Sequence, residues 1–112
     1  MNKIKRISGI ADEMIMVLLK HQFTKIELTV EPIPDGIRYF FIQHESQITQ
    51  EQLDELLAHL NRHRQIEYET YYWPLAGETT EDMSLSVIGR MINRAEAWVE
   101  DGKLYIILER EN

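Results

Sequence analysis

Histidines and carboxylates are the side chains of this 112-residue sequence whose types could do chemistry. His59 and His63 are four residues apart, so they could share a metal ion if one helix carried both. The spacing supplies no third ligand, and His44-Glu45 could join them only through the tertiary fold. A solvated helix face is the other interpretation, and we expect no metal site.

Nucleophilic catalysis has no support in the sequence. Cysteine is absent, which excludes a thiolate zinc site and a disulfide framework and fits a reducing cytoplasm. Ser8, Ser84 and Ser86 have no sequence sign of an activating histidine and base. We therefore name no catalytic residue and favour a protein that is not an enzyme.

Charge and hydropathy narrow the class of partner. The formal net charge is -7, so the long-range field repels nucleic-acid phosphates and anionic membranes. No segment approaches the roughly 20 apolar residues of a membrane span. Residues 1–112 should form a single cytoplasmic domain, with a protein partner or self-association in place of nucleic acid or membrane.

The first third of the chain predicts a helix followed by two strands. The helix runs from Ser8 to His21, with Ser8 as N-cap and Asp12 and Glu13 early, where the helix dipole favours acids. A period of two then predicts strands over 25–31 and 37–44. The second strand carries apolar residues on both faces and should be central.

A second helix and a long connection follow. Thr49 is the expected N-cap, Gln52 completes a capping box and Asn61 is the expected end. Residues 62–82 have no steady period but contain four aromatic residues. We interpret Tyr71, Tyr72, Trp73 and their neighbour Tyr68 either as a partner-binding patch or as a lid that closes the core.

The last part predicts a third helix and a hairpin. The helix starts from Asp82 or Ser84 and ends at Asn93-Arg94. Asp-Gly at 101–102 then joins two strands, in a register that sets Trp98 opposite Tyr105. This outward pair could form a homodimer surface or a sheet edge.

Together these elements predict an α+β fold. The order is α-β-β-α-loop-α-β-β, a two-layer sandwich with helices on one face of a mixed or antiparallel sheet of four or more strands.

That order resembles the ATP-binding domain of the histidine kinase, gyrase and Hsp90 group, the Bergerat or GHKL fold, over nearly the whole chain. In the family's first box, Glu-x-x-x-Asn-Ala-x-Lys-His, Glu13, Lys20 and His21 match. The magnesium-binding asparagine falls on Val17, which cannot ligate magnesium.

The other two boxes of the family have lost their key residues. The run Gln43–Gln47 aligns with Asp-x-Gly-x-Gly, so Gln43 could still accept a hydrogen bond, while Glu45 and Gln47 replace glycines. The third box, Gly-x-Gly-Leu, becomes residues 84–87 without glycine. The segment aligned with the nucleotide lid, 65–82, has five acids and no Lys or Arg, so the resemblance implies a degenerate relative without cofactor.

Three functional hypotheses remain. The first is a non-catalytic interaction or regulatory module on this scaffold. The second is an enzyme, either a divergent nucleotide binder that uses Glu13 and Gln43 or a hydrolase on another α+β fold; Glu13 matches a general base of some family members, or is simply an acid that the helix dipole favours. The third is a structural homo-oligomer. The partner-binding candidates are Tyr71, Tyr72, Trp73, Trp98 and Tyr105.

Overall fold

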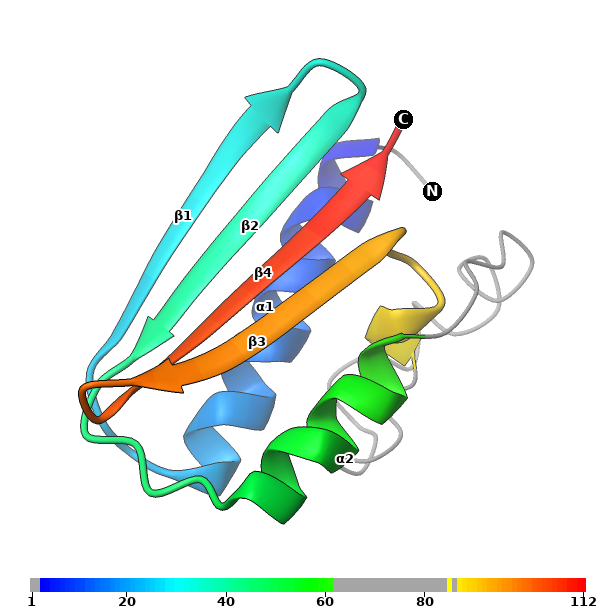
Figure 1. Ribbon diagram of the computed structural model, residues 1–112. Helices are drawn as coiled ribbons and strands as arrows, with labels where there is room; N and C mark the ends of the chain where they lie inside the picture. Colours follow the sequence, from blue (N-terminus) through cyan, green and yellow to red (C-terminus); the bar gives the residue numbers. More distant parts are fainter. Residues whose placement is uncertain (1–2, 62–84, 86) are drawn as a thin grey trace.

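The computed structural model describes residues 3–61, 85 and 87–112. The chain is α+β with a four-stranded antiparallel sheet, and both labelled helices lie on one side of that sheet (Figure 1). Its elements are, in chain order, α1 (Lys3–His21), β1 (Ile26–Ile33), β2 (Gly36–Gln43), α2 (Gln50–Leu60), β3 (Arg94–Glu100) and β4 (Lys103–Glu111). No helix in these described ranges is long and apolar enough to cross a membrane.

The sheet has the strand order β1-β2-β4-β3, so β2 is central, as its two apolar faces predicted. Alternate side chains of β2 and β4 point to opposite faces. Tyr39 and Phe41 are buried on the helix side, whereas Phe40 and Ile42 are half-buried on the other side. The hydrophobic core therefore lies between the helices and one face of the sheet.

Helix α1 begins five residues before the predicted start. Ser8 lies inside the helix, where its Oγ donates a hydrogen bond to the carbonyl of Lys5 at 3.3 Å, so it is not the N-cap. The residues from Lys3 to Ile7 favour helix well enough to extend it. In consequence Glu13 lies near the middle of α1, and the first turn contains no acid.

The start of α2 agrees with the prediction. Thr49 is the N-cap, its Oγ1 accepts from the Gln52 amide at 3.1 Å, and the Gln52 side chain accepts a bond from the Thr49 amide at 2.9 Å. Asn61 is the C-cap. A helical segment that includes Leu85 and residues 87–89 packs against the end of α2.

That helical segment ends earlier than expected. Arg90 and Met91 already form a turn, and Arg94 starts β3, so the predicted helix end at Asn93-Arg94 is wrong. The reason is a bond to the sheet, because the Asn93 amide donates to the Glu109 carbonyl at 2.8 Å. The β3–β4 register is as predicted, with Trp98 opposite Tyr105.

Candidate interaction surface

Gln43, a candidate for nucleotide binding, serves the fold. Its side chain is 0% exposed, and its Nε2 donates to the carbonyls of Leu18 at 3.1 Å and Gln22 at 2.8 Å. These bonds connect β2 to the C-terminal end of α1 and the residue after it, where the two carbonyls also accept backbone bonds from the Gln22 and Thr24 amides. Tyr39 contacts α1 nearer its N-terminus, where its Oη donates to the carbonyl of Ile7 at 2.9 Å. Both ends of α1 are thus fixed to β2.

The Gln43 Oε1 and the Glu13 carboxylate are buried on this side of the sheet without a hydrogen-bond partner among the described residues. The Glu13 side chain is 2% exposed, and neither of its carboxylate oxygens has such a partner. A buried charge without a partner destabilises a fold. Its mid-helix position removes the dipole explanation, since that effect is confined to the first turn.

A cavity of about 190 Å³ lies between α1 and α2. Apolar and polar side chains both line it, namely Leu18, His21, Ile48, Gln52, Glu55, Leu56, His59, Leu85 and Leu104. Neither Glu13 nor Gln43 lines it, so the two residues proposed for nucleotide binding do not meet in this space.

Metal ligands are not brought together in the part of the chain that the structure describes. No group of three or more His, Cys, Asp or Glu side chains there could hold a metal ion. His59 lies on α2, and His63 lies outside the described residues. His44 pairs with a carboxylate instead, with its Nε2 2.5 Å from Glu27 Oε2.

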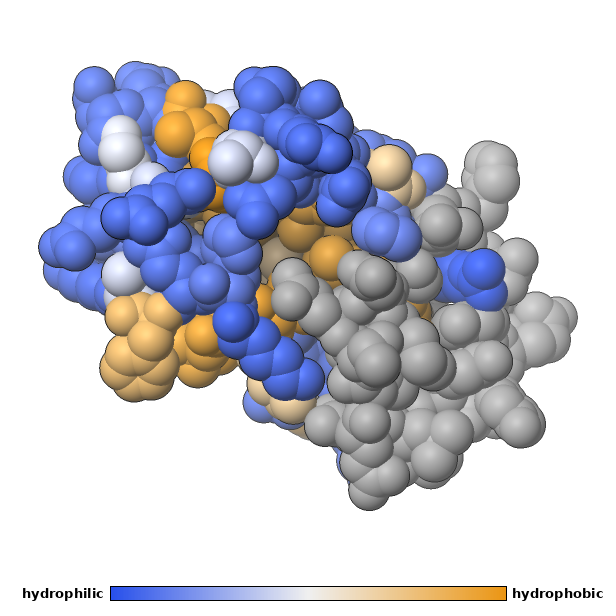
Figure 2. All heavy atoms as spheres, turned by 90° about the horizontal axis from the view of Figure 1, so that it is seen from below, coloured by the Kyte–Doolittle hydropathy of each residue, from blue (hydrophilic) through white to orange (hydrophobic). Residues whose placement is uncertain are grey.

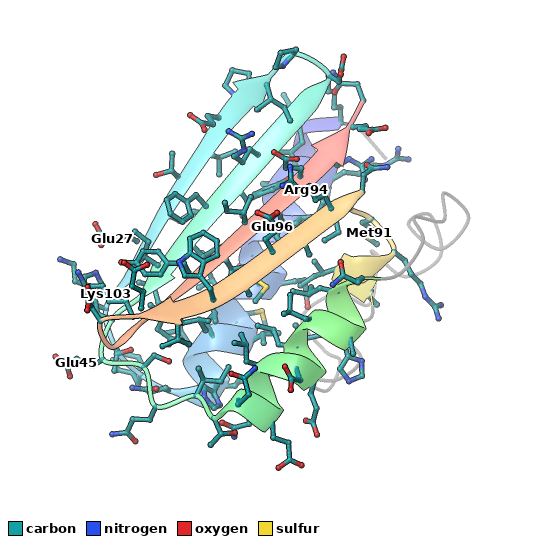
Figure 3. All side chains as sticks on the ribbon, in the orientation of Figure 1. Glu27, Glu45, Met91, Arg94, Glu96 and Lys103 are labelled. Carbon is teal, nitrogen blue, oxygen red and sulfur yellow. The ribbon has the colours of Figure 1, made fainter. Side chains whose placement is uncertain are left out.

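The open face of the sheet, the side without α1 and α2, carries an apolar centre (Figure 1, Figure 3). The apolar centre is the half-buried set Phe40, Ile42, Trp98, Tyr105 and Ile107. Phe40 lies opposite Ile107, and Tyr105 lies between Ile42 and Trp98. No helix among the described residues covers these side chains.

Three rings of the apolar centre form one stack across three strands. The Trp98 and Tyr105 ring centroids are 5.3 Å apart with planes at 10°, and those of Phe40 and Tyr105 are 6.2 Å apart at 29°. Stacked rings at these separations attract one another and hold fixed orientations. The result is a rigid aromatic surface that is still accessible to solvent.

An ionic row crosses all four strands beside the apolar centre. It consists of Glu31, Arg38, Glu109 and Arg94, one from each strand in sheet order, with alternating charge. Arg38 Nη2 lies 2.7 Å from Glu109 Oε2, and Arg94 Nη1 lies 3.3 Å from Glu109 Oε1. Arg94 also pairs with Glu96 on its own strand (Figure 3).

Charged groups also flank the other end of the apolar centre. The hydrogen bond from His44 is the main cause that lowers the pKa of the Glu27 carboxyl, and Lys25 and Lys103 lower it further. Glu27 and Lys103 lie at the same end of the sheet (Figure 3). The apolar centre is therefore bordered by charges on both sides, as the buried centre of a protein interface is bordered by a polar rim.

The open face is hollowed at the end that carries the ionic row. An open hollow of about 740 Å³ is lined there by Glu31, Pro32, Ile33, Pro34, Asp35, Arg38, Asn93, Arg94, Glu109 and Glu111. At the opposite end of the molecule, below the strands of Figure 1, hydrophilic side chains predominate and apolar atoms appear in separate patches (Figure 2). Apolar residues on the open face are contiguous by contrast.

Of the predicted partner-binding residues, the structure brings Trp98 and Tyr105 together on the open face, while Tyr71, Tyr72 and Trp73 lie outside the described residues. The sequence prediction missed Phe40 and the ionic row. The available signal was the alternation in β2, which places Phe40 and Ile42 on the face opposite Tyr39 and Phe41. No protein-family model matches this chain, and a search of curated proteins finds no significant match.

Proposed function

We propose that this protein is a non-catalytic interaction module whose open sheet face binds protein. The observation that carries the proposal is the stacked, solvent-accessible apolar centre bordered by charged groups of both signs. Tyr and Trp anchor protein interfaces because they bury a large area at a low entropic cost. A contiguous apolar surface of this kind marks an interaction site more often than scattered apolar residues do.

We further propose that the scaffold is that of the histidine-kinase-type ATPases with its nucleotide chemistry lost. One backbone feature supports this. Glu45, which aligns with the first glycine of the second family box, has a φ of 50°, in the left-handed region that favours glycine. Val17, at the magnesium-ligand position, is 3% exposed. The Gln43 Nε2 donates to the carbonyls of Leu18 and Gln22, while Gln43 Oε1 has no hydrogen-bond partner among the described residues.

Calorimetric titration with ATP and magnesium tests the absence of nucleotide chemistry. We expect no saturable heat up to millimolar ATP, because no oxygen ligand replaces the missing asparagine at Val17. Saturable binding that requires magnesium would contradict the proposed function.

A second candidate, a divergent nucleotide-binding enzyme, is favoured by one observation. Glu13 is a buried carboxylate without a partner among the described residues, and such groups occur at functional sites. If this candidate holds, Glu13→Gln abolishes nucleotide-dependent activity while leaving the fold intact by circular dichroism. The same substitution has no effect on binding by an interaction module that uses the open face.

A further inference from the structure

We propose that the occupant of the open face is a second copy of this chain, packed face to face about a two-fold axis parallel to the strands. This inference rests on the proposed function, since it names the partner for that surface. The charge pattern of the ionic row is the main argument.

A row of the open face is the set of side chains that lie side by side across the four strands. A two-fold axis parallel to the strands sets each row of one copy opposite the same row of the second copy. Within each row it reverses the order of the strands. The ionic row reads minus, plus, minus, plus from β1 to β3. Reversal sets Glu31 opposite Arg94 of the second copy and Arg38 opposite Glu109 of the second copy. All four members of the row therefore meet an opposite charge, so the row is complementary to itself.

The other rows add one further charge pair and the apolar contacts, while the same operation sets Glu27 opposite Trp98 and Thr29 opposite Glu96 of the second copy. The row at the far end of the sheet contains Lys25, which bonds to the end of β2, and Glu100, which lies at the end of β3. The two-fold axis therefore sets Lys25 of one copy opposite Glu100 of the other. Within the apolar centre, Phe40 meets Ile107 of the second copy, and Ile42 meets Tyr105 of the second copy. Two such faces pack about 10 Å apart with a small crossing angle, as in a β-sandwich.

The charge of the open face permits this association although the whole chain is acidic. The formal net charge of the chain is -7, but the rows of the open face hold both acidic and basic side chains. The six acids are Glu27, Glu31, Glu96, Glu100, Glu109 and Glu111, and the four bases are Lys25, Arg38, Arg94 and Lys103. The open face thus carries a formal charge of -2, and its bases give the acids of a second copy opposite charges to meet.

The size of the face sets the expected strength. Four strands about 4.8 Å apart and about 26 Å long give a face of roughly 500 Å² in projection. Two copies therefore bury on the order of 1,000 Å², the lower limit for a specific interface. We expect a reversible dimer that dissociates in the micromolar range.

Sedimentation velocity between about 5 and 500 μM tests the association. We expect the mass to rise from monomer to dimer over this range. Tyr105→Glu should weaken dimerisation at least tenfold, because it places a carboxylate at the apolar centre. The matched control is Phe23→Glu, since Phe23 is 89% exposed and lies in the turn after α1, and it should leave dimerisation unchanged. Circular dichroism melts of both variants confirm that each is folded.

Pulsed electron paramagnetic resonance tests the axis. The chain has no cysteine, so Asp35→Cys and Gln47→Cys each provide one spin-label site, at opposite ends of the sheet. An axis parallel to the strands sets each label near its mate, at about 15–25 Å in both variants. A perpendicular axis, which would pair Arg38 with His44 of the second copy, predicts about 30 Å or more and overturns the proposed arrangement.

The result also separates this inference from the proposed function. A strict monomer at about 500 μM overturns the second copy as occupant but leaves the open face available to a different protein. Loss of dimerisation in Phe23→Glu as well as in Tyr105→Glu also overturns it, because the open face would then not be the interface. Magnesium-dependent ATP binding would contradict the proposed function whatever the mass of the protein.

Discussion

The two faces of the sheet are built from the same strands but differ in burial. Along β4, Leu104, Ile106 and Leu108 are buried beneath the helices, while Tyr105 and Ile107 between them are half-buried on the open face. Polar side chains on the covered face bond to helix backbone, whereas those on the open face pair with each other across strands. Stability should therefore depend on the covered face and association on the open face.

The largest expected difference comes from two neighbouring isoleucines of β4. Ile106→Ala removes a side chain that is 0% exposed and should lower the free energy of unfolding by about 2–5 kcal/mol. Ile107→Ala, on the open face, should lower it by roughly 1 kcal/mol, because less of its surface leaves water on folding. Urea denaturation of the monomer measures both, and equal losses would contradict the assignment of the two faces.

Two tyrosines extend the comparison to pH. Burial raises the pKa of Tyr39 to about 12, so the folded protein keeps this phenol protonated at a pH where the unfolded chain ionises it. The stabilisation is full below pH 10 and is lost as the pH rises towards 12, by about 2–3 kcal/mol. Thermal melts should show this loss in the wild type and not in Tyr39→Phe.

Tyr39→Phe should also lose about 1 kcal/mol at neutral pH, since the bond to the Ile7 carbonyl disappears. Tyr105→Phe is the control from the open face, and it should keep the alkaline loss of the wild type. An unchanged alkaline loss in Tyr39→Phe would show that another group causes it.

Glu13 should be a weak point of the covered face. Glu13→Leu replaces an unpartnered buried carboxylate by an apolar side chain and should raise the free energy of unfolding by about 1–2 kcal/mol at pH 7. The matched control is the adjacent, exposed Asp12, where Asp12→Leu should change it by less than about 0.5 kcal/mol. Destabilisation by Glu13→Leu would mean that this carboxylate has a partner in the folded protein.

The smallest effect on stability is expected in the ionic row. Arg94→Ala removes the ion pairs of a largely exposed side chain with Glu96 and Glu109, which should contribute no more than about 0.5–1 kcal/mol to folding. The same change should weaken dimerisation more clearly, because two Arg94–Glu31 contacts are lost in each dimer. A large loss of folding stability with unchanged dimerisation would reverse the roles assigned to the two faces.

Local sequence signals predicted much of this fold. The capping box at Thr49, the hairpin at Asp101-Gly102 and the two-sided β2 each depend on residues close together in sequence, so their patterns were sufficient. The predicted helix start at Ser8 was wrong because a residue that is a good N-cap can also lie inside a helix and donate to a preceding carbonyl. The same error affected Glu13. A helix start at Ser8 would place Glu13 in the region where the helix dipole favours acids, whereas the start at Lys3 places it near the middle of α1.

The open face was only partly predictable. Trp98 and Tyr105 belong to one hairpin with a short turn, so their pairing followed from local register. The ionic row joins β1, β2, β3 and β4, which span most of the chain, and its pattern depends on strand order. Strand order is set by long-range packing, which no short motif in the sequence specifies.

Self-association through the open face is tested most directly by measuring the solvent accessibility of its side chains as a function of protein concentration. Paramagnetic relaxation by a soluble gadolinium chelate, observed by NMR, reports the exposure of individual side chains. We predict that Phe40, Ile107 and Tyr105 become protected between about 5 and 500 μM, while Phe23 stays accessible throughout. Unchanged access at Phe40, Ile107 and Tyr105 across this range would contradict self-association through the open face.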